Sequence, residues 1–222
     1  MHALNRIGTV FAYCPESGVM MSIQGFPSPF SEGDFQFKGI ENSAFSKLED
    51  DLISLAKERQ ALSPDLWVTS QWFHSQCAMA FSETQIKHLV KTVATQVGID
   101  FAETVANVLS ENEAYSSICQ NSLNIERAKR EAIQNGWQTS NSIKNYGITD
   151  PSALVEIAMI AAAQDGRSVS YFIKNYGITD PKALVEIAMI AAAEHGEGTS
   201  YFIKNYGITD SEALIAIAKI AA

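Results

Sequence analysis

The sequence predicts a mainly α-helical protein with a solenoid-like array of helical hairpins in its C-terminal half. The first observation is a repeat. The string I-K-N-Y-G-I-T-D begins at Ile143, Ile173 and Ile203, so the period is 30 residues (173 − 143). The second is an alanine-rich apolar segment after each string, which is typical of a helix. Repeats of this period stack as small helical units, and such arrays commonly hold another molecule.

The middle copy shows why each repeat is expected to be a helical hairpin. A short helix is predicted over Ser170–Tyr176, and Gly177 follows it where a left-handed C-terminal cap is needed. Asp180–Pro181 then supplies a cap and a first-turn proline for the next helix. The longer helix is predicted over Ala183–Ala193, and Gly196 ends the unit.

The longer helix is apolar on two neighbouring faces, so it is expected to be buried on two sides, against its own short helix and against the next copy. One face is predicted to hold Leu184, Ile187, Ala188 and Ala191, and the other Val185, Met189 and Ala192. The apolar run is too short to span a bilayer.

The outer copies differ from the middle one. Met159 and Met189 are replaced by Lys219 in the last copy, which we interpret as a lysine on a face that no further copy covers. Sequence drift, or a chain cut from a longer array, would also explain the change. A degenerate earlier copy is predicted where Ile118–Leu123 aligns with Ile173–Ile178, an alignment that places Ala128 under Ala183.

The N-terminal part, residues 1–139, is expected to combine a small sheet with helices and to share a core with the repeats in residues 140–222. A β-hairpin is predicted over residues 7–26 because β-branched and aromatic residues flank a turn. Four to six helices are predicted within residues 42–135, beginning at Asn42, Pro64, Ser82, Asp100 and Ser110. Capping boxes are predicted from the pairs Ser82 with Gln85 and Ser110 with Glu113.

Composition argues against several classes of protein. The net charge of −9 and the pI near 4.9 disfavour nucleic-acid binding, which depends on basic patches. Residues 140–222 carry six basic and nine acidic groups, and neither half contains a concentrated charge run. The odd number of cysteines, at no framework spacing, is typical of a reduced, cytosolic-type protein. The first residues lack the apolar core of a cleaved signal peptide.

Three residues outside the repeats are weak candidates for chemistry. His74 and Cys77 form H-x-x-C on one predicted helix face, but a structural zinc site needs four ligands, so no metal is expected. Cys14 ends a predicted strand and would need a histidine base to act as a nucleophile. A lone cysteine in an apolar strand is usually part of the core. No motif for a cofactor is present.

The surface of the short helices is the better candidate for function. Tyr171, Lys174 and Asn175 lie at positions i, i+3 and i+4 and should share an exposed face, while Phe172, Ile173 and Tyr176 should point inward. A ladder of such side chains suits an acidic or polar peptide surface. Near-identical copies also repeat residues that do nothing. The predicted binding residues are Lys144, Asn145, Tyr171, Lys174, Asn175, Tyr201, Lys204 and Asn205.

The string I-K-N-Y-G-I-T-D-P-K-A-L-V-E-I-A-M-I-A-A-A, followed by H-G-E-G-T-S-Y-F, resembles tandem helical repeats in proteins of intracellular bacteria. These include effectors delivered to host cells by a Dot/Icm-type type IV secretion system. The likeness covers the C-terminal 80 residues or so and transfers no catalytic residue. It implies a virulence protein that is cytoplasmic in the producing cell and is translocated to act on host factors or on a partner effector.

Taken together, these features favour a protein–protein interaction module, an effector or a regulator of one, over an enzyme. The alternative is a cysteine-dependent hydrolase or transferase in the N-terminal region, with the repeats recruiting its substrate. That alternative requires Cys14 or Cys77 to lie exposed in a cleft beside a histidine. The partner and the oligomeric state are left open by the sequence.

Overall fold

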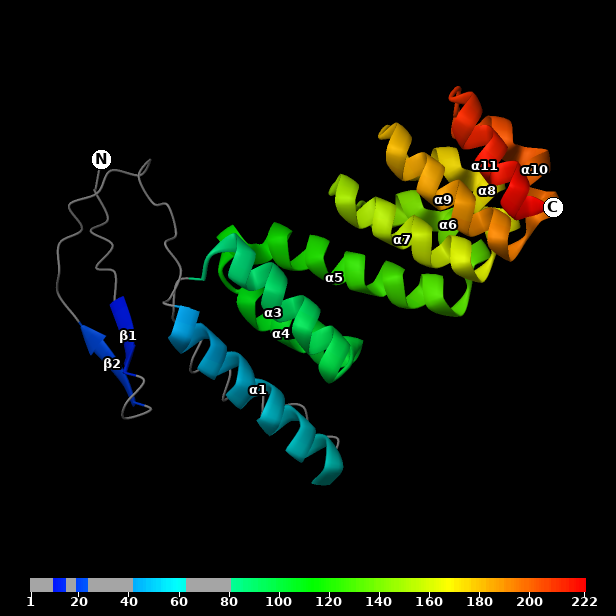
Figure 1. Ribbon diagram of the computed structural model, residues 1–222. Helices are drawn as coiled ribbons and strands as arrows, with labels where there is room; N and C mark the ends of the chain where they lie inside the picture. Colours follow the sequence, from blue (N-terminus) through cyan, green and yellow to red (C-terminus); the bar gives the residue numbers. More distant parts are fainter. Residues whose placement is uncertain (1–9, 15–18, 24–41, 63–80) are drawn as a thin grey trace, which may run out of the picture. The chain divides into compact units, whose positions relative to one another are not determined.

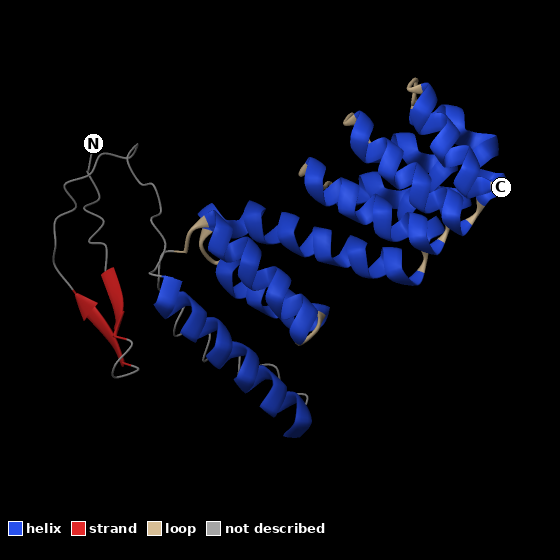
Figure 2. Cartoon of the chain, in the orientation of Figure 1, coloured by secondary structure: helices blue, strands red, loops and turns tan. Residues whose placement is uncertain are grey.

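The chain is mainly helical, as its sequence predicts (Figures 1 and 2). The computed structural model describes residues 10–14, 19–23, 42–62 and 81–222. It divides into two compact units, Met1–Leu123 and Asn124–Ala222. The division falls inside helix α5 (Glu113–Gln134), so this helix contributes residues to both units.

The first unit is built from helices around one hydrophobic core. Its helices are α1 (Asn42–Leu62), α3 (Glu83–Gln96), α4 (Ile99–Ser110) and the beginning of α5. The short strands β1 (Val10–Cys14) and β2 (Val19–Ile23) pair antiparallel. Each helix contributes side chains that are almost wholly buried: Leu48, Leu52, Leu89, Val90, Phe101, Val105 and Tyr115. The helix predicted from Pro64 lies outside the described residues.

Local capping explains where two of these helices begin. Ser82 and Gln85 form the predicted capping box, in which each side chain accepts a hydrogen bond from the other residue's backbone N–H. The box predicted from Ser110 and Glu113 is wrong, because Ser110 is the last residue of α4. Asn112 performs the capping instead, with its Oδ1 accepting from the N–H of Ala114 at 3.1 Å.

In the second unit, the three sequence copies form the same series of elements. Each has a short α-helix, one turn of 3₁₀ helix, a glycine in the left-handed conformation and a longer α-helix. The short helices are α6 (Gly136–Ser142), α8 (Gly166–Phe172) and α10 (Gly196–Phe202), which continue into η1 (Ile143–Tyr146), η2 (Ile173–Tyr176) and η3 (Ile203–Tyr206). The long helices are α7 (Pro151–Gln164), α9 (Pro181–Glu194) and α11 (Ser211–Ala221).

The turn between the short and long helices follows the sequence closely. Gly177 adopts φ of 66°, the left-handed conformation expected of a helix-ending glycine. The Asp180 carboxylate accepts a hydrogen bond from the N–H of Lys182, and Pro181 occupies the first turn of α9. The predicted cap and proline are therefore confirmed.

The short helices begin earlier than the sequence predicted. Helix α8 starts at Gly166, four residues before Ser170, because Asp165 caps it by accepting from the N–H of Ser168. Asn135 and His195 cap α6 and α10 in the same way. Asn135 precedes Asp165 by 30 residues, so the end of α5 keeps the full period. The predicted earlier copy is therefore out of register by five residues, and Ala128 corresponds to Ala188 in the middle copy instead of Ala183.

The long helices lie side by side, as do the short ones (Figure 1). Ile187, Ala188 and Ala191 of the first predicted face of α9 are fully buried, and Ala192 of the second face is buried as well. The expectation that Leu184 belongs to this buried face is wrong. Ala183 is buried there, and Leu184 is only half-buried because it lines a surface groove. Val185 and Met189 are half-buried in the same groove.

Glycine at the start of each short helix allows the helices to approach closely. A Cβ added at Gly166 would lie 2.3 Å from the backbone oxygen of Ala191 and 2.8 Å from its Cα. Gly196 has the same relation to Ala221, and Gly136 a looser one to Ala161. A side chain at these positions would push the short helix away from the long helix beneath it.

Gly166→Ala is expected to lower the free energy of unfolding by about 1–3 kcal/mol, the usual cost of overpacking. Urea denaturation followed by circular dichroism would measure this change. Ala193→Ser, an exposed substitution on α9, is the control and should change stability little. A Gly166→Ala protein as stable as the parent would show that the close contact with Ala191 does not constrain the packing.

Candidate functional site

Buried hydrogen bonds join each copy to the next. The hydroxyls of Ser140 and Tyr176 lie 3.0 Å apart, and Ser170 and Tyr206 form the same pair at the same distance. Each serine also donates to the backbone oxygen of the glycine four residues before it. Burial raises the pKa of Tyr206 to about 12, against a smaller opposing effect of the Ser170 hydroxyl. Burial also raises the pKa of Tyr176. These phenols are therefore structural links.

Two of the three predicted asparagines also link neighbouring copies. The side-chain amide of Asn175 donates to the backbone oxygen of Ser140 at 3.4 Å. Asn205 donates to the backbone oxygens of Ser170 and Tyr171 at 3.1 and 3.3 Å. Asn145, the first of the series, is exposed. Asn175 and Asn205 therefore have hydrogen-bond partners in the preceding copy and link neighbouring copies.

The predicted tyrosines and lysines lie on one exposed surface, which we call the helix A face. Tyr171 is 56% exposed and Tyr201 is 80% exposed, and all three lysines of the series are exposed. The face is defined by the exposed charged and aromatic side chains of the short helices and their 3₁₀ turns: Trp137, Lys144, Arg167, Tyr171, Lys174, Glu197, Tyr201 and Lys204. Ile173 and Tyr176 point inward as predicted, but Phe172 is only half-buried.

Phe172 is half-buried because it belongs to a chain of aromatic contacts that crosses two copies. The rings of Tyr171 and Phe172 meet edge-on, with centroids 4.7 Å apart. Tyr171 contacts Phe202 at 5.1 Å, and Phe202 contacts Tyr201 at 4.8 Å. A hollow of about 620 Å³ adjoins this chain and is lined by Arg167, His195, Glu197, Gly198, Ser200, Tyr201 and Phe202. The aromatic rings are thus held in place, with part of their surface in solvent.

Charge is segregated between the short and the long helices. The short helices and their 3₁₀ turns carry four cations, Lys144, Arg167, Lys174 and Lys204, and a single carboxylate, Glu197. Most of the acidic groups of the repeats belong to the long helices and to their capping residues. The helix A face is therefore locally positive on a chain of net charge −9.

Trp137 and Arg167 are members of this face that sequence reasoning missed. Each precedes the predicted start of its short helix, so neither was placed on the helix. The signal that would have found them is the N-cap residue followed by glycine, Asn135–Gly136 and Asp165–Gly166, which marks the true helix start. Trp137 is 48% exposed, an unusual position for a large indole ring.

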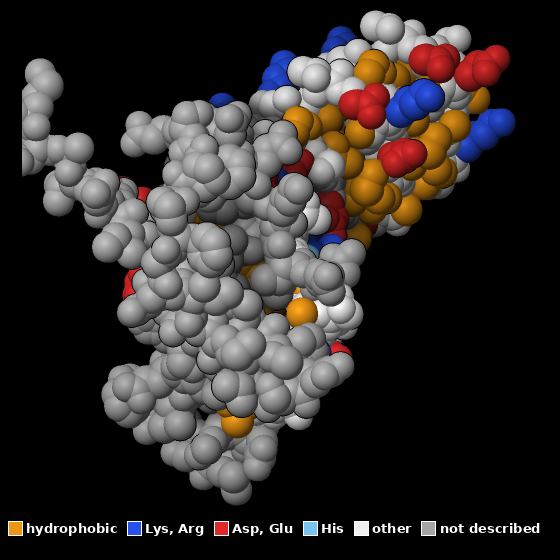
Figure 3. Space-filling view, turned by 90° about the vertical axis from the view of Figure 1, so that its left-hand side faces the viewer, with side chains coloured by type: hydrophobic (Ala, Val, Ile, Leu, Met, Phe, Trp, Pro, Cys, Tyr) orange, Lys and Arg blue, Asp and Glu red, His pale blue; other side chains and the backbone are white. Residues whose placement is uncertain are grey.

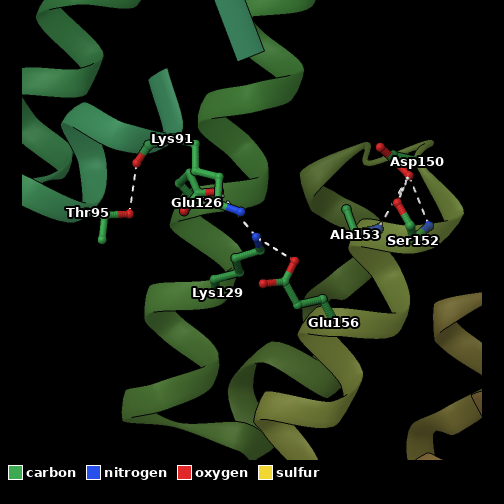
Figure 4. A network of polar contacts seen from close by, with 8 residues as sticks. All are labelled: Lys91, Thr95, Glu126, Lys129, Asp150, Ser152, Ala153 and Glu156. Atoms are coloured by element: carbon green, nitrogen blue, oxygen red, sulfur yellow. Dashed lines mark hydrogen bonds and ion pairs between the residues drawn. The ribbon is translucent and has the colours of Figure 1, made fainter. Parts of the chain in front are cut away.

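A charged network joins α5 to α7 on the long-helix side (Figure 4). Lys129 Nζ lies 2.7 Å from Glu156 Oε2 and 3.3 Å from Glu126 Oε1. By the 30-residue period, Lys129 occupies the position of Met159, Met189 and Lys219 in the later long helices. A side chain at this position therefore reaches the glutamate position of the following long helix.

The side chains of His74, Cys77 and Cys14, the weak candidates for chemistry, lie outside the described residues. Cys119 is fully buried, and burial raises the pKa of its thiol, which disfavours the nucleophilic thiolate. Within the described ranges, no three histidine, cysteine or carboxylate side chains gather as metal ligands would.

No helix in the described part of the chain combines the length and apolar character that crossing a bilayer requires. Comparisons with protein-family models, curated proteins and solved structures give no match to the chain.

Tyr206→Phe is expected to reduce the loss of stability at high pH. Because the pKa of Tyr206 is about 12 in the folded protein and about 10 in an unfolded chain, the neutral phenol contributes fully below pH 10. That contribution is lost as the pH rises through 12, and about 1 kcal/mol should be gone by pH 11. Urea unfolding at pH 8, 10 and 11 would compare Tyr206→Phe with the exposed control Tyr201→Phe. Equal pH slopes for the two variants would contradict the burial of the Tyr206 hydroxyl.

Asn205→Ala and Asn145→Ala form a matched pair that tests the asparagine links. Loss of the Asn205 hydrogen bonds should cost about 0.5–1.5 kcal/mol of unfolding free energy. The exposed Asn145 should be replaceable at a cost below about 0.5 kcal/mol. Thermal or urea unfolding of both variants measures the difference, and equal stabilities would show that the Asn205 hydrogen bonds do not stabilise the contact of η3 with α8.

Proposed function

We propose that residues 140–222 form a solenoid-like helical-repeat module that binds a partner protein through the helix A face. The observation that carries the proposal is the concentration of four cations and three large aromatic side chains on that face, with one carboxylate among them. Tryptophan, tyrosine and arginine are the residues most enriched at the energetic centres of interfaces. The complementary partner surface is an acidic segment with apolar side chains that pack against the exposed rings.

The three copies themselves support a role for the lysines. One exposed position of the short helices has diverged, since Trp137, Arg167 and Glu197 occupy it. The lysine position is also exposed, and Lys144, Lys174 and Lys204 are identical. A ladder of lysines at fixed spacing matches an elongated acidic ligand.

We further propose that the protein is a bacterial effector, or a regulator of one, that is cytoplasmic in the producing cell and delivered into a host cell. The support is the likeness of the I-K-N-Y-G-I-T-D-P-x-A-L-V-E-I-A repeat to the tandem repeats of such proteins. The proposed action is binding, without a chemical step, on a host factor or on a partner effector.

A matched pair of double charge reversals tests the helix A face. Lys174→Glu with Lys204→Glu should weaken partner capture at least about tenfold, because both cations would repel an acidic ligand. Lys182→Glu with Lys219→Glu makes the same change in net charge on the long helices and should leave capture intact. The full chain and both variants would be used to capture proteins from host-cell and bacterial lysates, with identification by mass spectrometry.

Circular dichroism would first establish that both variants fold as the parent does, since all four lysines are exposed. A partner that the helix A variant retains would contradict the proposal, as would one that both variants lose equally. Capture of no specific partner by the parent chain would also count against a binding module.

A further inference from the structure

A groove lies between the last two long helices, on residues that are not part of the helix A face. Its volume is about 540 Å³. Half-buried apolar side chains form much of its lining, chiefly Leu184, Val185, Met189 and Ile208. Ala213 and Tyr206 also line the groove, and the Tyr206 hydroxyl lies 3.0 Å from that of Ser170.

The last interface between long helices differs in one side chain from the interface before it. The pair Lys129 with Glu156 shows that one position on a long helix reaches the glutamate position of the next. The corresponding residues are Met159 with Glu186, and then Met189 with Ala216, where alanine replaces glutamate. Leu184, Val185 and Met189 are half-buried, as are their equivalents in α7, so the partly uncovered apolar side chains are a shared feature of the long helices.

The charges around the groove are opposite in sign to those of the helix A face. The two wall segments, residues 179–189 and 206–213, contain the exposed carboxylates Asp180, Glu186, Asp210 and Glu212 and a single exposed cation, Lys182. In Figure 1 the N-terminal ends of α7, α9 and α11 lie on the left, and Figure 3 views the molecule from that side. Hydrophobic side chains gather there among acidic and basic ones (Figure 3).

We propose that this groove is a second binding site, which accepts a partner segment with an apolar anchor flanked by lysine or arginine. An apolar side chain gains burial against Leu184, Val185 and Met189, where solvent now reaches. The flanking cations are attracted by the four carboxylates, while an acidic segment is repelled. The chain thus presents two sites of opposite preference: the helix A face selects acidic segments and the groove selects basic apolar ones. The groove proposal rests on its own residues and stands whether or not the helix A face binds a partner.

Fluorescence anisotropy with three short labelled peptides tests the groove on the full chain. One peptide alternates leucine or methionine with lysine and arginine, the second replaces its cations with glutamate, and the third replaces its apolar residues with serine. The first should bind most tightly, and its binding should weaken as salt is added. Equal binding of the acidic and basic peptides, or no binding of the basic apolar peptide, would overturn the proposal.

Two variants place the binding in the groove. Glu186→Lys reverses one exposed carboxylate and should weaken binding of the basic apolar peptide about fivefold. Ala213→Leu narrows the groove with an apolar residue and should weaken binding while leaving the charge unchanged. Glu197→Lys makes the same charge change as Glu186→Lys but lies on α10, outside the groove, and serves as the control.

Three results would overturn the assignment to the groove. They are parent-like binding by both Glu186→Lys and Ala213→Leu, an equal loss in Glu197→Lys, or a loss in the helix A variant Lys174→Glu with Lys204→Glu. Sedimentation of the unliganded chain distinguishes a different occupant. Self-association that Ala213→Leu abolishes would assign the groove to a second copy of the chain and overturn the peptide site.

Discussion

The contact between a glycine of each short helix and the backbone of the long helix beneath it is the constraint on which the second unit depends. At Gly166 there is no room for a Cβ against Ala191, and the same is true of Gly196 against Ala221. This contact sets the distance between the two helix layers. Hydrogen bonds then join the short-helix segments of neighbouring copies. The Ser170 hydroxyl of α8 contacts Tyr206 of η3, and the Asn205 amide donates to the backbone of α8.

These links also constrain the surface. The rings of Tyr171 and Phe202 meet edge-on, and the Asn205 amide donates to the backbone oxygen of Tyr171. The exposed rings therefore sit on a backbone that is fastened to the neighbouring copy. A ligand that binds such a surface loses little affinity to the ordering of the protein, because the side chains with few rotamers are already placed. This is the physical advantage of presenting aromatic residues on stacked helices instead of on loops.

Sequence reasoning recovered the local features of the copies and missed the features that depend on distance in space. Gly177 and Asp180 act through neighbours within three residues, so their roles follow from the string itself. The role of Asn205 depends on a backbone oxygen 35 residues away, and no pattern in the string distinguishes it from the exposed Asn145. Leu184 was misplaced for a similar reason. The periodicity gives the apolar faces of α9, but the groove beside Leu184 is formed with residues of the next copy, such as Ile208 and Ala213.

The copies serve as an internal comparison that separates scaffold from surface. The left-handed Gly177 and the buried Ile187 are, with their equivalents, the same in all three copies. One fully buried position varies, with Val169 in place of Thr139 and Thr199. Other positions that differ lie at or near the surface and alter its chemistry: Arg167 gives way to Glu197 on one side, and Glu186 to Ala216 on the other. A partner that spans two copies therefore contacts equivalent positions at a constant spacing, while the charges at some of these positions differ between the copies. Specificity on such a surface comes from the few positions that differ, while the shared glycine, serine and tyrosine residues hold those positions in register.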